Sequence, residues 1–158
     1  MQRILIAGEG GQGVQLIAEV LARAAVKIGK KATYIPNFGV EQRGGVSLAF
    51  VILDERSISY PKFLKADYLV VMTERAKKRV ESFQTSDTNY LDATAYNFQG
   101  IPNQAKNMYV LGRLAHLLGG LDFNVLWDTI EERIGSKFQK DPQLRKDDYR
   151  ALKKGYED

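Results

Sequence analysis

The residues of this chain whose types and spacing could do chemistry begin with a glycine run near the N-terminus. Residues 8–14 read Gly-Glu-Gly-Gly-Gln-Gly-Val, the pattern G-x-G-x-x-G between a strand-like stretch and a helical pattern. Glycine lets another group approach the backbone closely, and the amides at a helix start favour an anion. We therefore expect an anion-binding turn formed by Gly8, Gly10, Gly11, Gln12 and Gly13. A tight strand-to-helix turn that binds no ligand is the alternative.

A second segment, residues 36–45, places an arginine between a glutamate and two glycines. Arg43 can donate two parallel hydrogen bonds to a carboxylate or phosphate, and Gly44 and Gly45 leave it little steric cover. Glu41 is near enough in sequence to orient the guanidinium. The carboxyl ends of parallel strands meet at one edge of an open sheet, so we expect this segment beside the glycine turn. The alternative is a structural Glu–Arg pair in a glycine-rich loop.

One feature separates the chain from a standard NAD-binding domain. Such domains place a carboxylate about 20 residues after the glycine run, at the end of the second strand, where it binds the ribose. Here that strand ends Tyr34-Ile35-Pro36-Asn37, and the first carboxylate after it is Glu41. NAD is therefore not the favoured ligand. A stand-alone Rossmann-like nucleotide-binding protein remains an alternative function, as does a non-catalytic sensor or scaffold.

The residue types that the chain lacks exclude several reaction classes. There is no cysteine, so the chain has no disulfide, Cys-ligated iron–sulfur cluster or thiol nucleophile. His116 is the one histidine, and on its expected helix it shares a side with Tyr109 and Arg113, which indicates a polar-face residue rather than a base. Ser47 and Ser57 have no histidine partner in a triad-like arrangement. The acidic residues near the C-terminus lack the organisation of a metal site; they are Asp147, Asp148, Glu157 and Asp158. We expect the isolated chain to be non-catalytic.

Alternating strand-like and helical patterns must position the two glycine-rich segments. Apolar runs predict strands at 2–7, 31–35, 46–53 and 68–72, and helical spacing predicts helices at 14–28 and 74–82. Gly29 is placed to end the first helix, and Pro36 to end the second strand. This order predicts an α/β, Rossmann-like three-layer fold with a mainly parallel sheet and helices on both faces.

The C-terminal third is predicted to be helical. Residues 108–118 are apolar on most sides, which indicates a buried helix. Asp122 can cap the start of the next helix, which Gly135 would close, and Asp141-Pro142 opens a last helix toward Gly155. No linker, repeat or low-complexity run divides the sequence, so residues 1–158 are expected to form a single domain.

Charge and hydropathy indicate the kind of partner and compartment. The formal net charge is +4, and the basic residues are spread along the chain, which favours an acidic protein partner over nucleic acid. The apolar stretch at the N-terminus is too short for a signal peptide or a membrane span. We therefore expect a cytoplasmic protein that binds neither nucleic acid nor a membrane.

Four segments of the sequence form a joint pattern. The first two are G-x-G-G-Q-G-V at 8–14 and P-x-x-G-x-E-x-R-G-G at 36–45. The others are Asn-Met-Tyr-Val-Leu-Gly at 107–112 and Ala-Leu-Lys-Lys-Gly-Tyr at 151–156. Together they resemble the γ subunit, or γ domain, of the 2-oxoacid:acceptor (ferredoxin) oxidoreductases, whose patterns are N-M-x-x-L-G and A-[FL]-x-x-G in the last two segments. That family often has asparagine where this chain has Asp148.

The resemblance implies a function that the residues alone do not. The family includes pyruvate, 2-oxoglutarate, 2-oxoisovalerate and indolepyruvate ferredoxin oxidoreductases, which decarboxylate a 2-oxoacid oxidatively, join the acyl group to coenzyme A and reduce ferredoxin. It implies that thiamine diphosphate and iron–sulfur clusters belong to thiamine-binding and ferredoxin-like partner subunits. This chain would contribute assembly and the coenzyme A side of the site. The turn and Arg43 can face coenzyme A or a partner's carboxylate, and the purified chain is expected to expose residues 38–45 and to self-associate.

Overall fold

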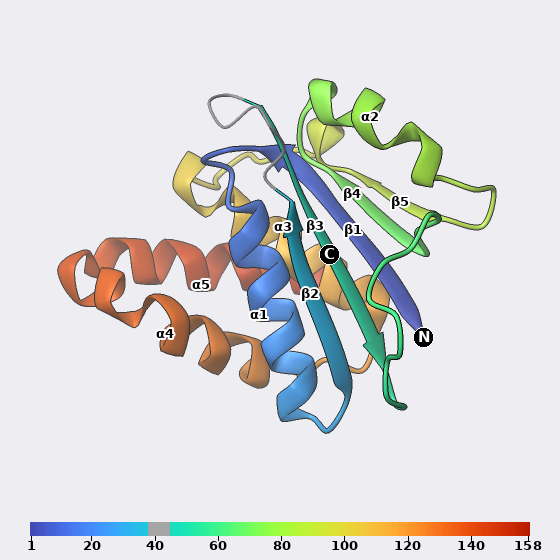
Figure 1. The fold of residues 1–158 in the computed structure, drawn as a ribbon. Helices are drawn as coiled ribbons and strands as arrows, with labels where there is room; N and C mark the ends of the chain where they lie inside the picture. The colour runs from blue at the N-terminus through green and yellow to red at the C-terminus, as the bar shows by residue number, and fades with distance from the viewer. Residues whose placement is uncertain (38–44) are drawn as a thin grey trace. The chain divides into compact units, whose positions relative to one another are not determined.

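The computed structural model describes residues 1–37 and 45–158, which form two compact units, Met1–Tyr96 and Asn97–Asp158. The first unit holds the sheet and the helices that cover it, and the second unit is helical (Figure 1). No helix in the described residues is long and apolar enough to cross a membrane.

The sheet of the first unit has five strands in the order β2-β3-β1-β4-β5. Their bounds are β1 Gln2–Glu9, β2 Lys31–Asn37, β3 Val46–Asp54, β4 Tyr68–Val71 and β5 Asn89–Asp92. β1 pairs in parallel with β4, and β4 with β5, whereas β3 runs antiparallel to both of its neighbours, β1 and β2. The predicted α/β class with a helical C-terminal part is confirmed, in a mixed sheet.

The antiparallel strand has a simple physical cause. Only the eight residues 38–45 connect β2 to β3, and a parallel crossover needs a dozen or more. The chain therefore has to turn back directly beside β2. Two successive reversals leave β2 pointing in the same direction as β1, so these two strands end at the same edge of the sheet.

Helix α1, Val14–Lys27, covers one face of the sheet. It lies along β2 and β3 (Figure 1), and its buried stripe includes Ile17, Leu21 and Ala24 at helical spacing. Gly29, with φ 91°, follows the helix end, as predicted. The apolar stripe thus fixes the start of α1 against the end of β1, where the glycine run lies.

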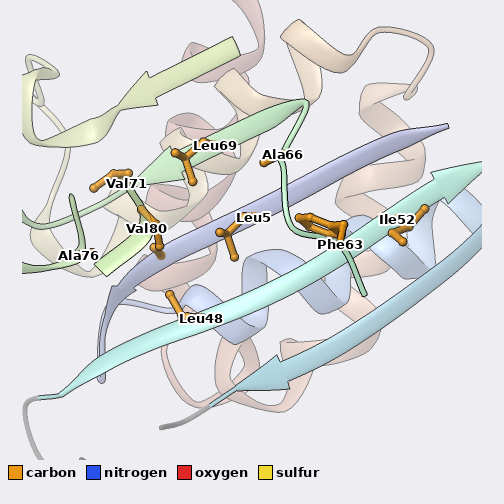
Figure 2. Close-up of a cluster of buried hydrophobic side chains, with 10 residues drawn as sticks. Leu5, Leu48, Ile52, Phe63, Ala66, Leu69, Val71, Ala76 and Val80 are labelled. Carbon is orange, nitrogen blue, oxygen red and sulfur yellow. The ribbon is translucent and has the colours of Figure 1, made fainter. Parts of the chain in front are cut away.

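The opposite face is covered by a second apolar layer. Helix α2, Glu74–Val80, begins at Thr73, whose hydroxyl caps it by accepting from the Ala76 amide, and a 3-10 turn, η1 Glu81–Phe83, continues it. Figure 2 shows the cluster beneath it, where side chains of β1, β3, β4 and α2 meet those of the β3–β4 connection. The cluster contains Leu5, Ala7, Leu48, Ile52, Phe63, Ala66, Leu69, Val71, Ala76 and Val80.

Two details of the first unit differ from the sequence prediction. Pro36 does not end the second strand, because β2 continues through it to Asn37. β2 is the edge of the sheet, and an edge strand tolerates proline where the missing N–H would face outward. β5 was not predicted, because its four residues Asn-Tyr-Leu-Asp include only one buried apolar side chain.

The second unit consists of a short 3-10 turn, η3 Asn103–Ala105, and three helices. These are α3 Lys106–Leu118, α4 Phe123–Lys140 and α5 Pro142–Glu157. Asp122 and Asp141 cap α4 and α5 by accepting from the amides of Val125 and Leu144, as the sequence predicted. Gly135 does not close α4, which continues through a kink at Ile134 to Lys140.

The two C-terminal motifs meet where α3 and α5 cross. A Cβ on Gly112 of α3 would lie 2.6 Å from the Tyr156 amide nitrogen and would also clash with the Leu152 carbonyl oxygen. A Cβ on Gly155 of α5 would clash with the Tyr109 carbonyl oxygen. The backbones therefore touch at this crossing, which explains the glycine in each of the two segments.

Candidate functional site

The glycine run forms the predicted strand-to-helix turn between β1 and α1. β1 ends at Glu9, whose carbonyl accepts from the Gln12 amide at 3.2 Å. Gly11 has φ 91°, and Gly13, at the N-cap of α1, has φ 80°. These left-handed values disfavour any residue with a Cβ, so the two glycines are required by the backbone itself.

Gln12 holds this turn to the neighbouring strand. Its Oε1 accepts from the Glu9 amide at 2.8 Å, and its Nε2 donates to the Met72 carbonyl at 3.3 Å. A Cβ on Gly8 would lie 2.8 Å from the same Oε1. Gly8 and Gln12, both predicted as binding residues, thus have a structural role in joining the ends of β1 and β4.

The open side of the turn lies at Gly10 and Gly11. A Cβ on either residue would meet nothing within 4 Å. The first turn of α1 carries no acidic residue, so no carboxylate of the helix itself neutralises its N-terminal amides. An anion can therefore approach the backbone here, as the close-approach argument from the sequence requires.

The contacts of two residues near the turn, Arg75 and Gln15, were not anticipated from the sequence. Arg75, in the first turn of α2, lies 3.6 Å from the Glu9 carboxylate. On the other side, Gln15 of α1 donates to the Ser47 hydroxyl and the Leu48 carbonyl, both at 2.9 Å, and accepts from the Tyr34 hydroxyl at 2.6 Å. Each joins residues far apart in sequence, and no spacing rule links such residues before the sheet order is known.

The second predicted segment is placed only by its two ends. Glu41, Arg43 and Gly44 lie outside the described residues, whereas Gly45 is described and buried. Asn37 pairs with Leu48, and Gly45 directly precedes Val46, which pairs with Glu9 of β1. The two ends of the segment therefore lie at the edge of the sheet that carries the glycine turn, as expected.

His116 is exposed, and its Nδ1 lies 2.9 Å from the Tyr156 carbonyl oxygen. Across the described ranges, 1–37 and 45–158, no group of three or more His, Asp or Glu side chains could hold a metal ion. The exposed backbone of the glycine turn at Gly10 and Gly11 is the feature of the sheet unit that suits an anion.

The sequence of the sheet unit matches a known family along most of its length. The family model described as pyruvate ferredoxin/flavodoxin oxidoreductase matches residues 3–96. The pyruvate synthase subunit PorC of Methanothermobacter thermautotrophicus is 28% identical over 98% of this chain and 97% of that subunit. The 2-oxoglutarate synthase subunit KorC of Archaeoglobus fulgidus is 29% identical over 98% of this chain and 86% of that subunit.

Solved structures share the fold over the whole chain. A keto/oxoacid ferredoxin oxidoreductase γ subunit from Geobacter sulfurreducens has a TM-score of 0.70 and 23% identity, covering 99% of this chain and 97% of its own. A 2-oxoglutarate:ferredoxin oxidoreductase from Magnetococcus marinus has a TM-score of 0.80 and 16% identity, covering 99% of this chain and 31% of its own. The family model covers more than half of the residues of this chain, which therefore belongs to the pyruvate ferredoxin/flavodoxin oxidoreductase family.

Proposed function

We propose that the chain is the γ-type subunit of a multi-subunit 2-oxoacid:ferredoxin oxidoreductase. The observation that carries the proposal is its full-length match to proteins that are themselves separate subunits, PorC and KorC. The complex would remove carbon dioxide from a 2-oxoacid, transfer the acyl group to coenzyme A and pass the electrons to ferredoxin. Pyruvate and 2-oxoglutarate enzymes match about equally well, so the proposal stops at the 2-oxoacid class.

Within such a complex, the glycine turn is proposed to face an anionic group. Gly10 and Gly11 are open to approach, and the N-terminal amides of α1 favour negative charge. Arg43 would add a bidentate donor from the neighbouring segment, with Glu41, Gly44 and Gly45 shaping its surroundings. The anion would be a phosphate of coenzyme A or a carboxylate of a neighbouring subunit. Losing the contact with a phosphate would raise the coenzyme A KM, whereas losing the contact with a carboxylate would weaken subunit retention.

The redox cofactors are assigned to the partner subunits. The chain has no cysteine to hold an iron–sulfur cluster. Thiamine diphosphate would likewise be bound by a thiamine-binding subunit, and the clusters by a ferredoxin-like one. This chain would then contribute assembly and the coenzyme A side of the active site, and would be inactive alone.

Co-expression with the thiamine-binding and ferredoxin-like subunits tests the proposal. The chain should co-purify with both through size exclusion, and the complex should reduce a viologen dye only with a 2-oxoacid and coenzyme A. A chain that elutes alone, and whose melting temperature rises with NAD or FAD, would instead support a stand-alone nucleotide-binding protein.

Arg43→Lys tests the site within that complex. Lysine keeps the charge but loses the two-pronged donor, so we expect a loss of about 1–3 kcal/mol at a bidentate contact. A raised coenzyme A KM with normal assembly would identify the coenzyme as the anion. Weakened subunit retention would identify a partner carboxylate, and no change in KM, turnover or retention would end the claim for Arg43.

A further inference from the structure

The face of the sheet opposite α1 carries an open aromatic groove of about 600 Å³. Its floor is the edge-to-face trio of Phe50, Phe63 and Phe83, with ring centroids 5.3 to 6.5 Å apart. One wall is the end of β2, residues 35–37, and the rim carries Tyr60 and Leu64 from the β3–β4 connection. Figure 2 shows where Phe63 anchors this connection over the sheet, beside Ile52.

The rim exposes more apolar surface than folding requires. Leu64 is 82% exposed and Tyr60 69% exposed, whereas the adjacent Phe63 is 9% exposed and packs into the core. A single exposed leucine needs no explanation. Two large apolar side chains bordering an aromatic groove form a contiguous patch, which is typical of a surface that another protein covers.

The charge of the groove indicates what that protein presents. Lys62 is the only charged residue among those described that line the groove. Lys65 donates to the Ser82 carbonyl at 2.6 Å, which holds a second cation next to Phe83. Neither lysine pairs with a carboxylate within the described ranges. A partner with carboxylates around an apolar side chain would therefore complement this face.

Two other occupants fit the groove less well. A second copy of the chain would bring Lys62 and Lys65 of both copies to one junction, where like charges repel. Strand addition to β2 is hindered because Pro36 offers no amide donor on this edge strand.

The same fold also occurs as part of a longer chain. In the Magnetococcus marinus enzyme it covers 31% of the chain, so there it is joined to other parts of an oxidoreductase.

We propose that this groove receives an apolar side chain, flanked by carboxylates, from another subunit of the oxidoreductase complex. The proposal goes beyond the glycine-turn site and rests on the chain being a subunit. The groove residues would anchor the contact by burial of Tyr60 and Leu64, and the two lysines would orient it.

The test is the affinity of the purified chain for the assembly of the remaining subunits. Leu64→Asp and Tyr60→Ser should each lower it at least about tenfold, as loss of a buried anchor does. Val26→Asp is the matched control, because Val26 is 56% exposed on α1 of the same unit, away from the groove, and this variant should bind like the wild type. Thermal melting checks that each variant folds.

Charge reversal separates the carboxylate flanks from the apolar anchor. Lys62→Glu should weaken binding at low salt, and the wild-type affinity should fall more steeply with salt than that of Lys62→Glu. Unchanged affinity in Leu64→Asp and Tyr60→Ser, or a self-association that these variants abolish, would overturn the proposal. A wild-type chain that does not bind the other subunits at all would instead refute its function as a subunit.

Discussion

Asp148 is a carboxyl group buried inside the helical unit. It is 2% exposed, and its Oδ1 has no hydrogen-bond partner among the described residues. Burial, and then the neighbouring charges of Asp147 and Asp141, raise the pKa of Asp148 to about 7. The folded chain therefore holds a proton on this residue at pH values where the unfolded chain has released it.

This proton makes stability depend on pH with a defined sign. Between the unfolded pKa of 3.8 and the folded pKa of about 7, the folded state binds more protons than the unfolded state. Asp148 therefore costs the fold least below pH about 4, and its cost grows as the pH rises from there to about 7, above which it stays constant. We predict that Asp148→Asn raises the free energy of unfolding at pH 8 by about 1–3 kcal/mol.

Urea unfolding at pH 5 and pH 8 measures this effect. The wild type should lose stability between the two pH values, whereas Asp148→Asn should lose much less. Asp128→Asn is the control, because Asp128 is exposed on α4 and should leave the difference between the two pH values unchanged. A wild type that is equally stable at both pH values would contradict a buried, protonated Asp148.

Gly10 gives the cleanest probe of the turn, because a Cβ there meets nothing within 4 Å and its φ is not positive. Gly10→Ala should change the free energy of unfolding by less than about 0.5 kcal/mol. It should still raise the coenzyme A KM or weaken assembly, since it blocks approach to the backbone.

Gly11→Ala, at φ 91°, should instead destabilise the fold by about 1 kcal/mol or more, as circular dichroism melts would show.

At the scale of elements, the crossing of α3 and α5 depends on two glycines. Gly112→Ala places a methyl group against the α5 backbone, which cannot move aside as a side chain can. We predict a loss of about 1–3 kcal/mol or more, the usual cost of overpacking. Gly135→Ala on α4 is the control, because its Cβ meets nothing and alanine favours a helix. Equal melting temperatures for the two variants would contradict the close crossing.

The sequence predicted the elements that carry periodic apolar patterns and clear caps. α1, α3, and the starts of α4 and α5 all have a stripe or a capping residue that acts within a few positions. The reversal of β3 follows from a connection too short for a parallel crossover, so the predicted strand bounds already contained it although the prediction of a mainly parallel sheet did not use it. The short β5 depends on its pairing with β4, which no local pattern encodes. Gly135 predicted a helix end because its turn signal is local, whereas the buried side chains beyond it, including Phe138, continue the helix.

The candidate site was predictable to a similar degree. The glycine spacing identified the turn, because a backbone with positive φ at two positions requires glycine there. The structural use of Gln12 was not predictable, because its partner Met72 is 60 residues away. The contact of Arg75 with Glu9 likewise requires the parallel pairing of β1 and β4.

The molecule as a whole has the features expected of one subunit of a larger complex. Its net charge of +4, the apolar groove with its lysines and the open glycine turn are all features that a partner can complement. Under the proposed function, the glycine turn would bind and orient an anion, and the iron–sulfur clusters would belong to other chains, because this chain has no cysteine. Isolated chain should therefore show no 2-oxoacid-dependent dye reduction.

An omission assay tests whether the chain is a subunit of a 2-oxoacid:ferredoxin oxidoreductase. The rate of 2-oxoacid- and coenzyme A-dependent viologen reduction is measured for the thiamine-binding and ferredoxin-like subunits with and without this chain. We predict that leaving the chain out lowers the rate at least about tenfold, equivalent to about 1.4 kcal/mol of barrier, and that adding it back restores the rate. Equal rates with and without the chain would contradict its function as a subunit of the oxidoreductase.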